Sequence, residues 1–98
     1  LFVNKPAAAI AVCRRGGATA AFQTMNMPFM MMNMPVVTSQ YWNIAYGRDP
    51  GEAAQDAEGM QTMRTLADNM AFLLKKLHAE GAPQYPEREA WNPMNFIR

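Results

Sequence analysis

An uninterrupted apolar run from Ala7 to Val12 is the feature that most restricts how this chain can fold. The run follows Pro6 and is closed by the adjacent glycines Gly16 and Gly17. A strand without polar alternation has no face suited to water, so a run of this kind is typical of a parallel strand covered on both faces. Parallel strands need crossover helices, and the segment therefore predicts an α/β fold.

Two further segments continue the alternation of strand and helix. Residues 18 to about 25 carry apolar side chains three or four positions apart and predict a helix, which Pro28 should end or bend. Residues Val36–Ser39 follow Pro35 and include β-branched side chains, so they predict a second short strand. A loop with two aromatic residues comes next.

A second helix is predicted from its N-terminal signals and its apolar period. Asp49 can cap it, Pro50 suits the first helical position, and Glu52 completes the spacing of a capping box. Gly81 can end it. Its apolar residues recur on one helical face: Met60, Met63, Leu66, Ala67, Met70, Leu73, Leu74 and Leu77.

The last segment contains three prolines and no sustained period. It predicts an extended tail over residues 83–98, packed on the domain or on a partner subunit through Tyr85, Trp91 and Phe96. Residues 1–82 then form a βαβα unit of about two strands and two helices. Two strands that are apolar on both faces leave unpaired edges, so the unit needs strands from a missing segment or from another chain.

Composition excludes several classes of protein. With 98 residues the chain forms one domain at most, and a formal net charge of +1 provides no strong field for nucleic acid or anionic lipid. Cys13 is the only cysteine, which excludes an internal disulfide and a zinc or iron–sulfur site held by this chain alone. No apolar stretch approaches the roughly 20 residues of a membrane span. We therefore expect a soluble, cytoplasmic protein that binds neither nucleic acid nor membrane. Its first residue is Leu1, which suggests that residues have been removed from its front.

The two predicted strands place the loops that follow them on one rim. In an open parallel sheet, ligands bind beyond the carboxyl ends of the strands, where Arg14–Ala18 and Gln40–Asn43 are expected. Glycines let a flat ligand approach the main chain, the start of a helix offers free amides, and arginines add charge-assisted hydrogen bonds. The alternative is a tight turn with solvated arginines, and the residues by themselves leave both interpretations open.

Residues 25–34 contain six methionines. A soft-metal site for Cu(I) is one interpretation of such a cluster. Because no histidine or second cysteine lies nearby in the sequence, a flexible apolar surface in a core or an interface is the favoured interpretation.

Four ordered segments resemble a known family. They are KPAAAIAVCRRGGATAAF, MPVVTSQYWNIAYG, EGMQTMRTLADNMAFLL and the terminal NFIR. Together they look like the C-terminal half of the flavodoxin-like NAD(P)H-dependent FMN reductases, in the branch of the iron–sulfur flavoproteins and their relatives without the cysteine cluster. The resemblance implies a parallel sheet of order 2-1-3-4-5 that binds FMN at its carboxyl rim. It makes Ala7–Cys13 the fourth strand and Val36–Ser39 the fifth.

The resemblance also implies roles at the flavin site. In the loop after the fourth strand, main-chain groups would contact the polar edge of the flavin ring, and Arg15 would face flavin or nicotinamide phosphate. The loop after the fifth strand would lie near the flavin or a subunit interface. The implied cofactor-binding residues are Arg14, Arg15, Gly16, Gly17, Ala18, Tyr41, Trp42 and Asn43.

The function that the resemblance implies is electron transfer from NAD(P)H through FMN to a small-molecule acceptor such as a quinone. No catalytic side chain is expected, because the flavin performs the hydride chemistry. The family's phosphate-binding loop would precede Leu1, so FMN would require the N-terminal half or a partner chain, and the chain alone would be inactive. The alternative is a non-catalytic module that forms homo-oligomers through its methionine-rich helix and its strand edges.

Overall fold

The computed structural model describes residues 1–94. Five elements follow one another along the chain: β1 (Ala11–Cys13), α1 (Ala18–Met31), β2 (Ile44–Tyr46), the 3-10 helix η1 (Glu52–Gln55) and α2 (Ala57–Leu77). The two strands are parallel. The prediction of an α/β chain with two parallel strands and two main helices is therefore confirmed, while a flavodoxin-like topology stays a prediction.

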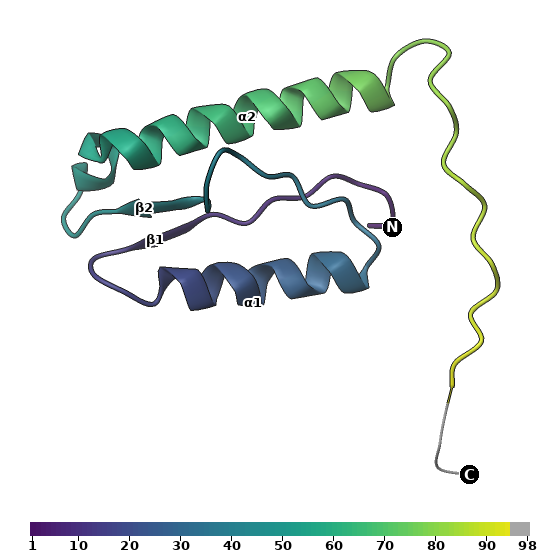
Figure 1. Cartoon of the computed structure of the whole chain (residues 1–98), viewed down its shortest axis with the longest axis horizontal. Coiled ribbons are helices and arrows are strands. Elements are labelled where there is room, and N and C mark those ends of the chain that lie inside the picture. The colour runs from purple at the N-terminus through teal and green to yellow at the C-terminus, as the bar shows by residue number, and fades with distance from the viewer. Residues whose placement is uncertain (95–98) are drawn as a thin grey trace.

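The sheet lies between the two helices, with α1 on one side and α2 on the other (Figure 1). On the α1 side, Ala11 and Ile44 pack with Ala18 in a small buried cluster. On the α2 side, a Cβ built on Gly59 would lie 2.9 Å from the Cβ of Ala45, which is 1% exposed. Small side chains at both positions therefore allow α2 to lie close against β2.

The predicted strand at Val36–Ser39 is wrong over most of its length. Val36 forms only an isolated parallel bridge with Ala7, and the chain then leaves the sheet before it pairs again over β2. The paired residues are 29 positions apart in the sequence at Ala7–Val36 and 33 positions apart at Ala11–Ile44. The second segment therefore has four more residues than the first between the two pairings, and these bulge out. The predicted strand Ala7–Val12 is likewise paired only at Ala7 and over β1.

The bulging segment, residues 38–42, is an excursion from the sheet, and hydrogen bonds to α2 hold this excursion in place. The Asn69 side-chain amide donates to the carbonyl oxygen of Thr38 at 2.8 Å. The Thr65 hydroxyl lies 3.1 Å from Oε1 of Gln40 and 3.1 Å from the Gln61 carbonyl oxygen, and it can donate its one hydrogen to either. Asn69 and Thr65 are one helical turn apart on α2, so a single helix face holds the segment that would otherwise have continued the strand.

Helix α1 continues beyond the predicted end near Met25 and runs to Met31 with Pro28 inside it. A proline within a helix removes one backbone hydrogen bond, but the turn after Pro28 closes again because the Met32 N–H donates to the Pro28 carbonyl oxygen at 2.9 Å. The chain then reverses at Asn33, whose φ of 57° lies in the left-handed region that asparagine tolerates.

Helix α2 begins later than its capping signals predicted. The Glu52 carboxylate does accept the N–H groups of Arg48 at 2.7 Å and of Asp49 at 2.9 Å, as a capping box requires, but these bonds start only the one-turn helix η1. Asp56 is the N-cap of α2 and accepts the N–H of Gly59 at 2.9 Å. Donation from Gly59, and then from Tyr46, holds the pKa of Asp56 below its usual value of 3.8.

The apolar face predicted for α2 is largely the face that meets the sheet. Leu66 is buried there, and Met60, Met63, Met70, Leu73 and Leu77 are half-buried. The structure adds two small buried residues, Gly59 and Thr62, and leaves Ala67 and Leu74 exposed. Within the described residues, no helix is both long enough and apolar enough to cross a bilayer.

The chain has much more surface than a compact domain of its size. Its accessible surface is 8062 Å², against about 5,600 Å² expected for its mass, and its radius of gyration is 17.2 Å, against about 13 Å.

Residues 83–94 form an extended tail that leaves the packed part of the chain (Figure 1). Tyr85 attaches it, because the phenol donates to the Asn4 carbonyl oxygen at 2.8 Å. Trp91 is 86% exposed, and the predicted anchor Phe96 lies outside the described residues.

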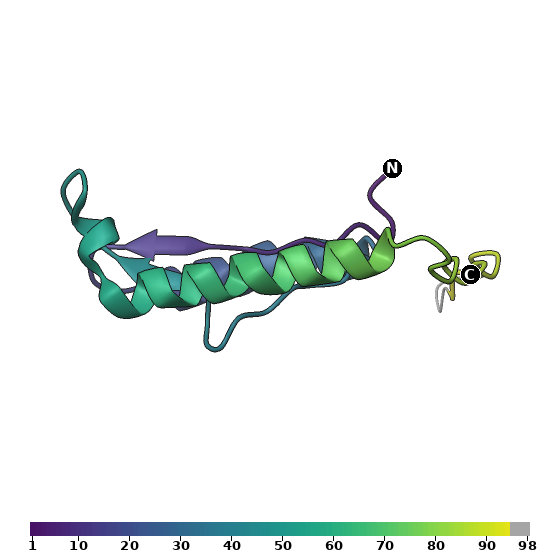
Figure 2. The same cartoon turned by 90° about the horizontal axis from the view of Figure 1, so that it is seen from above.

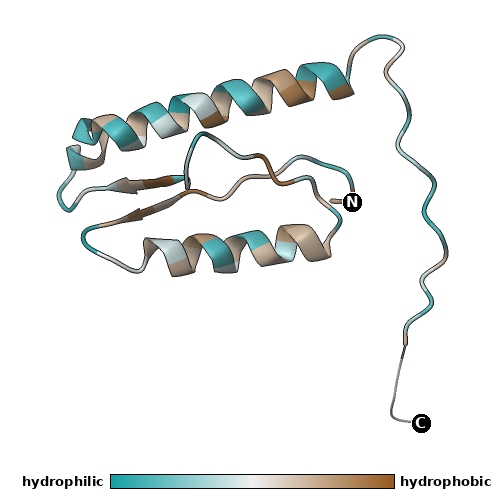
Figure 3. Cartoon of the chain, in the orientation of Figure 1, coloured by the Kyte–Doolittle hydropathy of each residue, from teal (hydrophilic) through white to brown (hydrophobic). Residues whose placement is uncertain are grey.

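Apolar residues lie along both strands and in the last turns of α1 (Figure 3). Seen from above, β1 lies beside α2, whereas β2 lies largely behind it (Figure 2). The side chains of Ile10 and Val12 are accordingly 50% and 57% exposed, although both belong to the apolar run. Met27, Met30 and Met31 are exposed on α1, which places the methionine-rich segment on the surface.

We predict that Asp56→Asn lowers the free energy of unfolding at pH 7 and makes it less sensitive to acid. Because the pKa of Asp56 is depressed in the folded state, its carboxylate stabilises the fold above the pKa of the unfolded chain, about 3.9, and loses this contribution as the pH falls below it. Urea unfolding from pH 7 to pH 2.5 should therefore show a difference between the variant and the wild type that shrinks with acid. Asp68→Asn, an exposed change within α2, is the control; a difference that is independent of pH would contradict the prediction.

Candidate functional site

The segment Arg14–Gly17 connects the carboxyl end of β1 to the start of α1, as the sequence predicted, and all four residues are exposed. Gly17 occupies the N-cap position with a φ of 88°. Within the described residues, no side chain caps α1 and its first turn contains no acidic residue. The first N–H groups of α1 therefore lack a side-chain partner, and the helix dipole makes this end of α1 partly positive.

The two glycines have different reasons to be glycine. Gly17 adopts a left-handed conformation that other residues rarely accept. A Cβ built on Gly16 would meet no atom of the described chain within 4 Å, and its φ is not positive. Neither internal packing nor backbone geometry requires glycine at position 16, so the absence of a side chain keeps the outer surface of this loop open to another molecule.

Ala18 plays a different part from its neighbours in this loop. It is the first residue of α1, and its side chain is buried at 5% exposure in the cluster with Ala11 and Ile44. Only its main-chain N–H is oriented for a ligand by its position at the helix start. A cofactor contact from Ala18 is thus a main-chain contact.

Tyr41 and Trp42 do not lie where the sequence placed them. They precede β2, so they belong to the excursion beside the sheet and not to its carboxyl rim, where Gly47 follows β2 instead. The prediction that they share a rim with Arg14–Ala18 is wrong, because the pairing resumes at Ile44 and not at Val36. Their rings are 5.3 Å apart between centroids at 37°, and both side chains are more than half exposed.

Asn43 is engaged within the protein. Its side chain is 2% exposed, and its Nδ2 donates to the Ala9 carbonyl oxygen at 3.0 Å. Its Oδ1 lies 2.6 Å from the Ser39 hydroxyl, which is also 2.7 Å from the carbonyl oxygen of Tyr41 and can donate its one hydrogen to either. The amide of Asn43 closes the gap that the excursion leaves in the sheet, so it has no free group to offer a cofactor.

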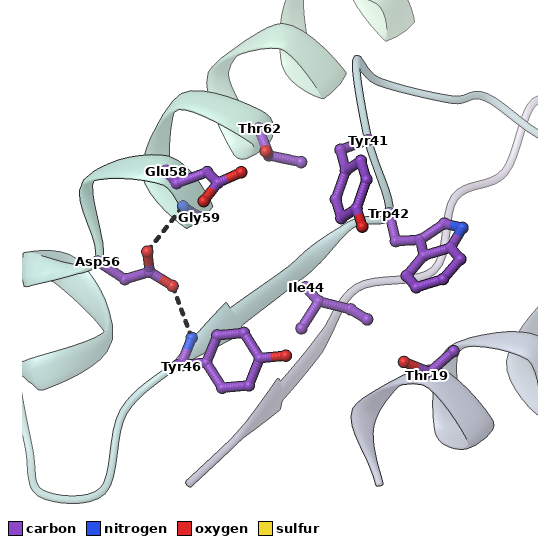
Figure 4. Close-up of a pocket in the computed structure, with 9 residues that line it drawn as sticks. All are labelled: Thr19, Tyr41, Trp42, Ile44, Tyr46, Asp56, Glu58, Gly59 and Thr62. Carbon is purple, nitrogen blue, oxygen red and sulfur yellow. Dashed lines mark hydrogen bonds between the residues drawn. The ribbon is translucent and has the colours of Figure 1, made fainter. Parts of the chain in front are cut away.

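A pocket of about 140 Å³ crosses the outer edge of β2 (Figure 4). Tyr41 and Trp42 form one wall, Tyr46 comes from β2, Glu58 comes from the first turn of α2, and Thr19 comes from the first turn of α1. Residues from the first turns of both helices, which lie on opposite sides of the sheet, therefore line the same pocket. Sequence reasoning missed Thr19, Tyr46 and Glu58, although Tyr46 directly precedes Gly47 at the end of a short apolar run.

The polar groups in this pocket include the carboxylates of Asp56 and Glu58. Asp56 uses one carboxylate oxygen for the Gly59 N–H and the other for the Tyr46 N–H at 2.8 Å, which favours its ionised form (Figure 4). The aromatic rings of Tyr41, Trp42 and Tyr46 provide most of the apolar wall. Across residues 1–94, histidine, cysteine, aspartate and glutamate form no group of three that could hold a metal ion. The pocket therefore combines aromatic side chains with the carboxylates of Asp56 and Glu58.

No protein-family model matches the chain, and comparisons with curated proteins and with solved structures found no match. The resemblance to the FMN reductases therefore stays a prediction that rests on the residues themselves.

We predict that Asn43→Ala lowers the free energy of unfolding by about 1–3 kcal/mol, because it leaves the Ala9 carbonyl oxygen buried without its donor. Asn69→Ala is the matched control, since it removes one hydrogen bond from an exposed amide to the Thr38 carbonyl oxygen and should cost about 1 kcal/mol or less. Urea denaturation of both variants measures the difference. Equal losses would show that the amide of Asn43 does not hold the sheet together.

Proposed function

We propose that this chain forms one wall of a flavin site in an FMN-dependent NAD(P)H oxidoreductase. The observation that carries the proposal is the position of Thr19, which belongs both to the start of α1 and to the pocket with the aromatic wall. It lies in the uncapped first turn of α1, directly after the exposed Arg14–Gly17 loop, and it also lines the pocket walled by Tyr41 and Trp42. An anion-attracting helix start and an aromatic wall thus adjoin one another.

These two features match the two halves of a flavin's chemistry. The isoalloxazine ring is flat and aromatic, and offset stacking on Tyr41 or Trp42 would bury part of it. The pyrimidine edge of the ring carries carbonyl oxygens. The N–H groups at the start of α1 would donate hydrogen bonds to them, and the absence of a side chain at Gly16 would let this edge approach. Arg15, one residue before that surface, would pair with a phosphate of flavin or nicotinamide. The aromatic side chains and the start of α1 support one wall of a flavin site, and the pocket of about 140 Å³ is too small to enclose the whole ring system, so the second component must supply the rest.

The flavin, when bound, would supply the hydride chemistry between NAD(P)H and a small-molecule acceptor. The side chains of this chain would bind and orient it. A complete site would further need a phosphate-binding loop, which the resemblance assigns to an N-terminal half or a partner chain. The activity of the assembled enzyme is proposed on that basis, and the chain alone is expected to be inactive.

We predict that Gly16→Val weakens FMN binding by at least tenfold without lowering the unfolding midpoint. The Cβ of the new side chain meets no protein atom within 4 Å, so we expect the fold to tolerate it, but the side chain covers the surface that the flavin edge would approach. Titration of FMN into the chain assembled with the N-terminal half or partner that supplies the phosphate-binding loop, followed by flavin absorbance and fluorescence, measures the affinity. Gly47→Val is the contrasting control, because its Cβ would lie 2.5 Å from the Ala53 nitrogen and should destabilise the fold itself. Unchanged flavin spectra with the wild-type assembly, or equal affinity of the assembly that carries Gly16→Val, would contradict the flavin proposal.

A second candidate function is assembly of two copies through the open edge of β1. In the observed register the Ala11 N–H donates to the Asn43 carbonyl oxygen at 3.0 Å and the Cys13 carbonyl oxygen accepts from Gly47 at 3.1 Å, so both residues face β2. The peptide groups of Ile10 and Val12 point the other way and have no hydrogen-bond partner within residues 1–94. Unpaired strand edges of this kind pair readily with another strand.

The two edges of the sheet differ, and the edge of β1 is the better candidate for pairing with a second copy. On the outer edge of β2, the Tyr46 N–H donates to the Asp56 carboxylate at 2.8 Å and the Ile44 N–H donates to the Trp42 carbonyl oxygen at 2.7 Å. That edge is closed by the chain itself. The apolar run that contains β1 has neither a charged residue nor a proline between Ala7 and Cys13, which are the usual means of blocking an edge.

A twofold axis would pair β1 antiparallel with β1 of the second copy, because such an axis exchanges each residue with its counterpart. The side chains of Ile10 and Val12, both about half exposed, would be covered at the same time. A stable interface needs about 800 Å² from each partner. The surface of 8062 Å² exceeds the compact value of about 5,600 Å² by more than this, even though the tail contributes part of the excess.

We predict that the wild-type chain sediments as a dimer at micromolar concentration and that Val12→Lys sediments as a monomer. A lysine on a strand edge opposes pairing and should leave the fold intact, because Val12 is exposed. Tyr46→Lys places the same charge on the closed edge of β2 and should leave the dimer unchanged. Circular dichroism checks that both variants are folded. A monomeric wild type, or a Val12→Lys dimer of wild-type affinity, would exclude this assembly.

A further inference from the structure

The pocket at the outer edge of β2 has aromatic side chains on two sides. Figure 4 shows the ring of Tyr46 on one side of Ile44 and the rings of Tyr41 and Trp42 on the other. The planes of the last two rings are inclined at 37°, with centroids 5.3 Å apart, so these rings do not stack in parallel. The face of an aromatic ring is partly negative and attracts a cation. Rings that surround a pocket at different angles can contact one compact cation together.

The charged side chains that line this pocket are both acidic. They belong to Asp56 and Glu58, and none of the described lining residues is lysine, arginine or histidine. Asp56 accepts the N–H groups of Gly59 and Tyr46, which favours its ionised form and offsets the positive end of α2. Glu58 is exposed, and the one ion pair among residues 1–94 lies elsewhere. Two full negative charges outweigh the partial charge of about +0.5 at the start of α1, so the pocket attracts cations.

We propose that this pocket binds a small quaternary ammonium ion, in which the nitrogen carries only alkyl groups. An ammonium with N–H groups must replace its hydrogen bonds to water when it enters a pocket, and both oxygens of Asp56 are already in use. A quaternary ammonium has no N–H groups to satisfy, so aromatic rings and the carboxylate of Glu58 suffice for it. The pocket of about 140 Å³ is close in size to a cavity that holds benzene, and tetramethylammonium has fewer heavy atoms than benzene.

This inference goes beyond the flavin proposal and does not rest on it. The two proposals share Tyr41 and Trp42, but the flavin also needs Arg15, the start of α1 and a second component. The cation instead needs Glu58 at the start of α2, and this chain provides every residue that the proposal uses. Failure of FMN to bind the assembled enzyme would therefore leave the cation proposal unaffected, and failure of the cation to bind would leave the flavin proposal unaffected.

Three small molecules separate a quaternary ammonium site from an apolar hollow and from simple charge attraction. Choline and 3,3-dimethyl-1-butanol have nearly the same shape, but the second has a neutral carbon in place of the charged nitrogen. Ethanolamine keeps the charge and lacks the methyl groups. Titration of each into the full ¹⁵N-labelled chain at pH 7, followed by amide chemical shifts, gives the affinity and the location of binding.

We expect saturable shifts with choline at Trp42, Gly59 and Thr62, and binding of choline about tenfold tighter than that of either other molecule. Equal affinity for choline and 3,3-dimethyl-1-butanol would show that the pocket is only an apolar hollow. Equal affinity for ethanolamine would show only charge attraction. Either result, shifts confined to other parts of the chain, or the lack of any saturable shift would overturn the proposal.

Two variants with matched controls test the roles of the ring and of the carboxylate. Trp42→Leu keeps an apolar side chain without its aromatic face and should weaken choline binding by about fivefold; Trp91→Leu, at a position that is 86% exposed on the tail, should not. Glu58→Gln keeps the shape without the charge and should weaken choline binding by about threefold while leaving 3,3-dimethyl-1-butanol unaffected.

Glu80→Gln makes the same change of charge at an exposed position outside the pocket and should leave choline binding unchanged. Circular dichroism checks that each variant is folded. Wild-type affinity for choline in both Trp42→Leu and Glu58→Gln, or equal losses in the two controls, would contradict the assignment of this pocket. The comparison of the three molecules on the wild-type chain does not require any variant to fold.

Discussion

The buried amide of Asn43 is the contact on which the sheet depends. The first extended segment pairs with the second at Ala7 and again from Ala11, and between these points the second segment has left the sheet. The Asn43 side chain fills the gap by donating to the Ala9 carbonyl oxygen at 3.0 Å. A side chain thus takes the place of a main-chain donor, and a strand interrupted by four extra residues still belongs to one sheet.

The excursion that Asn43 makes possible also creates the pockets. Because Thr38 and Gln40 are held by one face of α2, Tyr41 and Trp42 are carried out over the edge of β2, where they wall one pocket and close another. A regular strand from Val36 to Ser39 would have placed these rings beyond the carboxyl end of the sheet. The same departure leaves a second cavity, of about 240 Å³, between α1 and this segment.

The narrow sheet has two edges of different character. Asp56 serves two elements at once, since it caps α2 through Gly59 and closes the edge of β2 through the Tyr46 N–H. Among residues 1–94 no side chain closes the edge of β1 in this way, and α2 covers β2 while Val12 stays 57% exposed. The apolar run that predicted a strand covered on both faces is therefore only partly covered within the described residues. Both proposed functions follow from this incompleteness, because a shared cofactor site and a strand interface each require a second component.

Local sequence determined the class of the fold, the order of its elements, the Arg14–Gly17 loop before a helix, and the apolar face of α2. These features depend on residues close together in the chain, such as an apolar run, a pair of glycines or a spacing of three and four. The position of β2, the role of Asn43 and the pockets were decided only by tertiary structure. They depend on hydrogen bonds between residues 25 to 34 positions apart, from Thr65 to Gln40, Asn69 to Thr38 and Asn43 to Ala9, and no local pattern records which distant donor a carbonyl will meet.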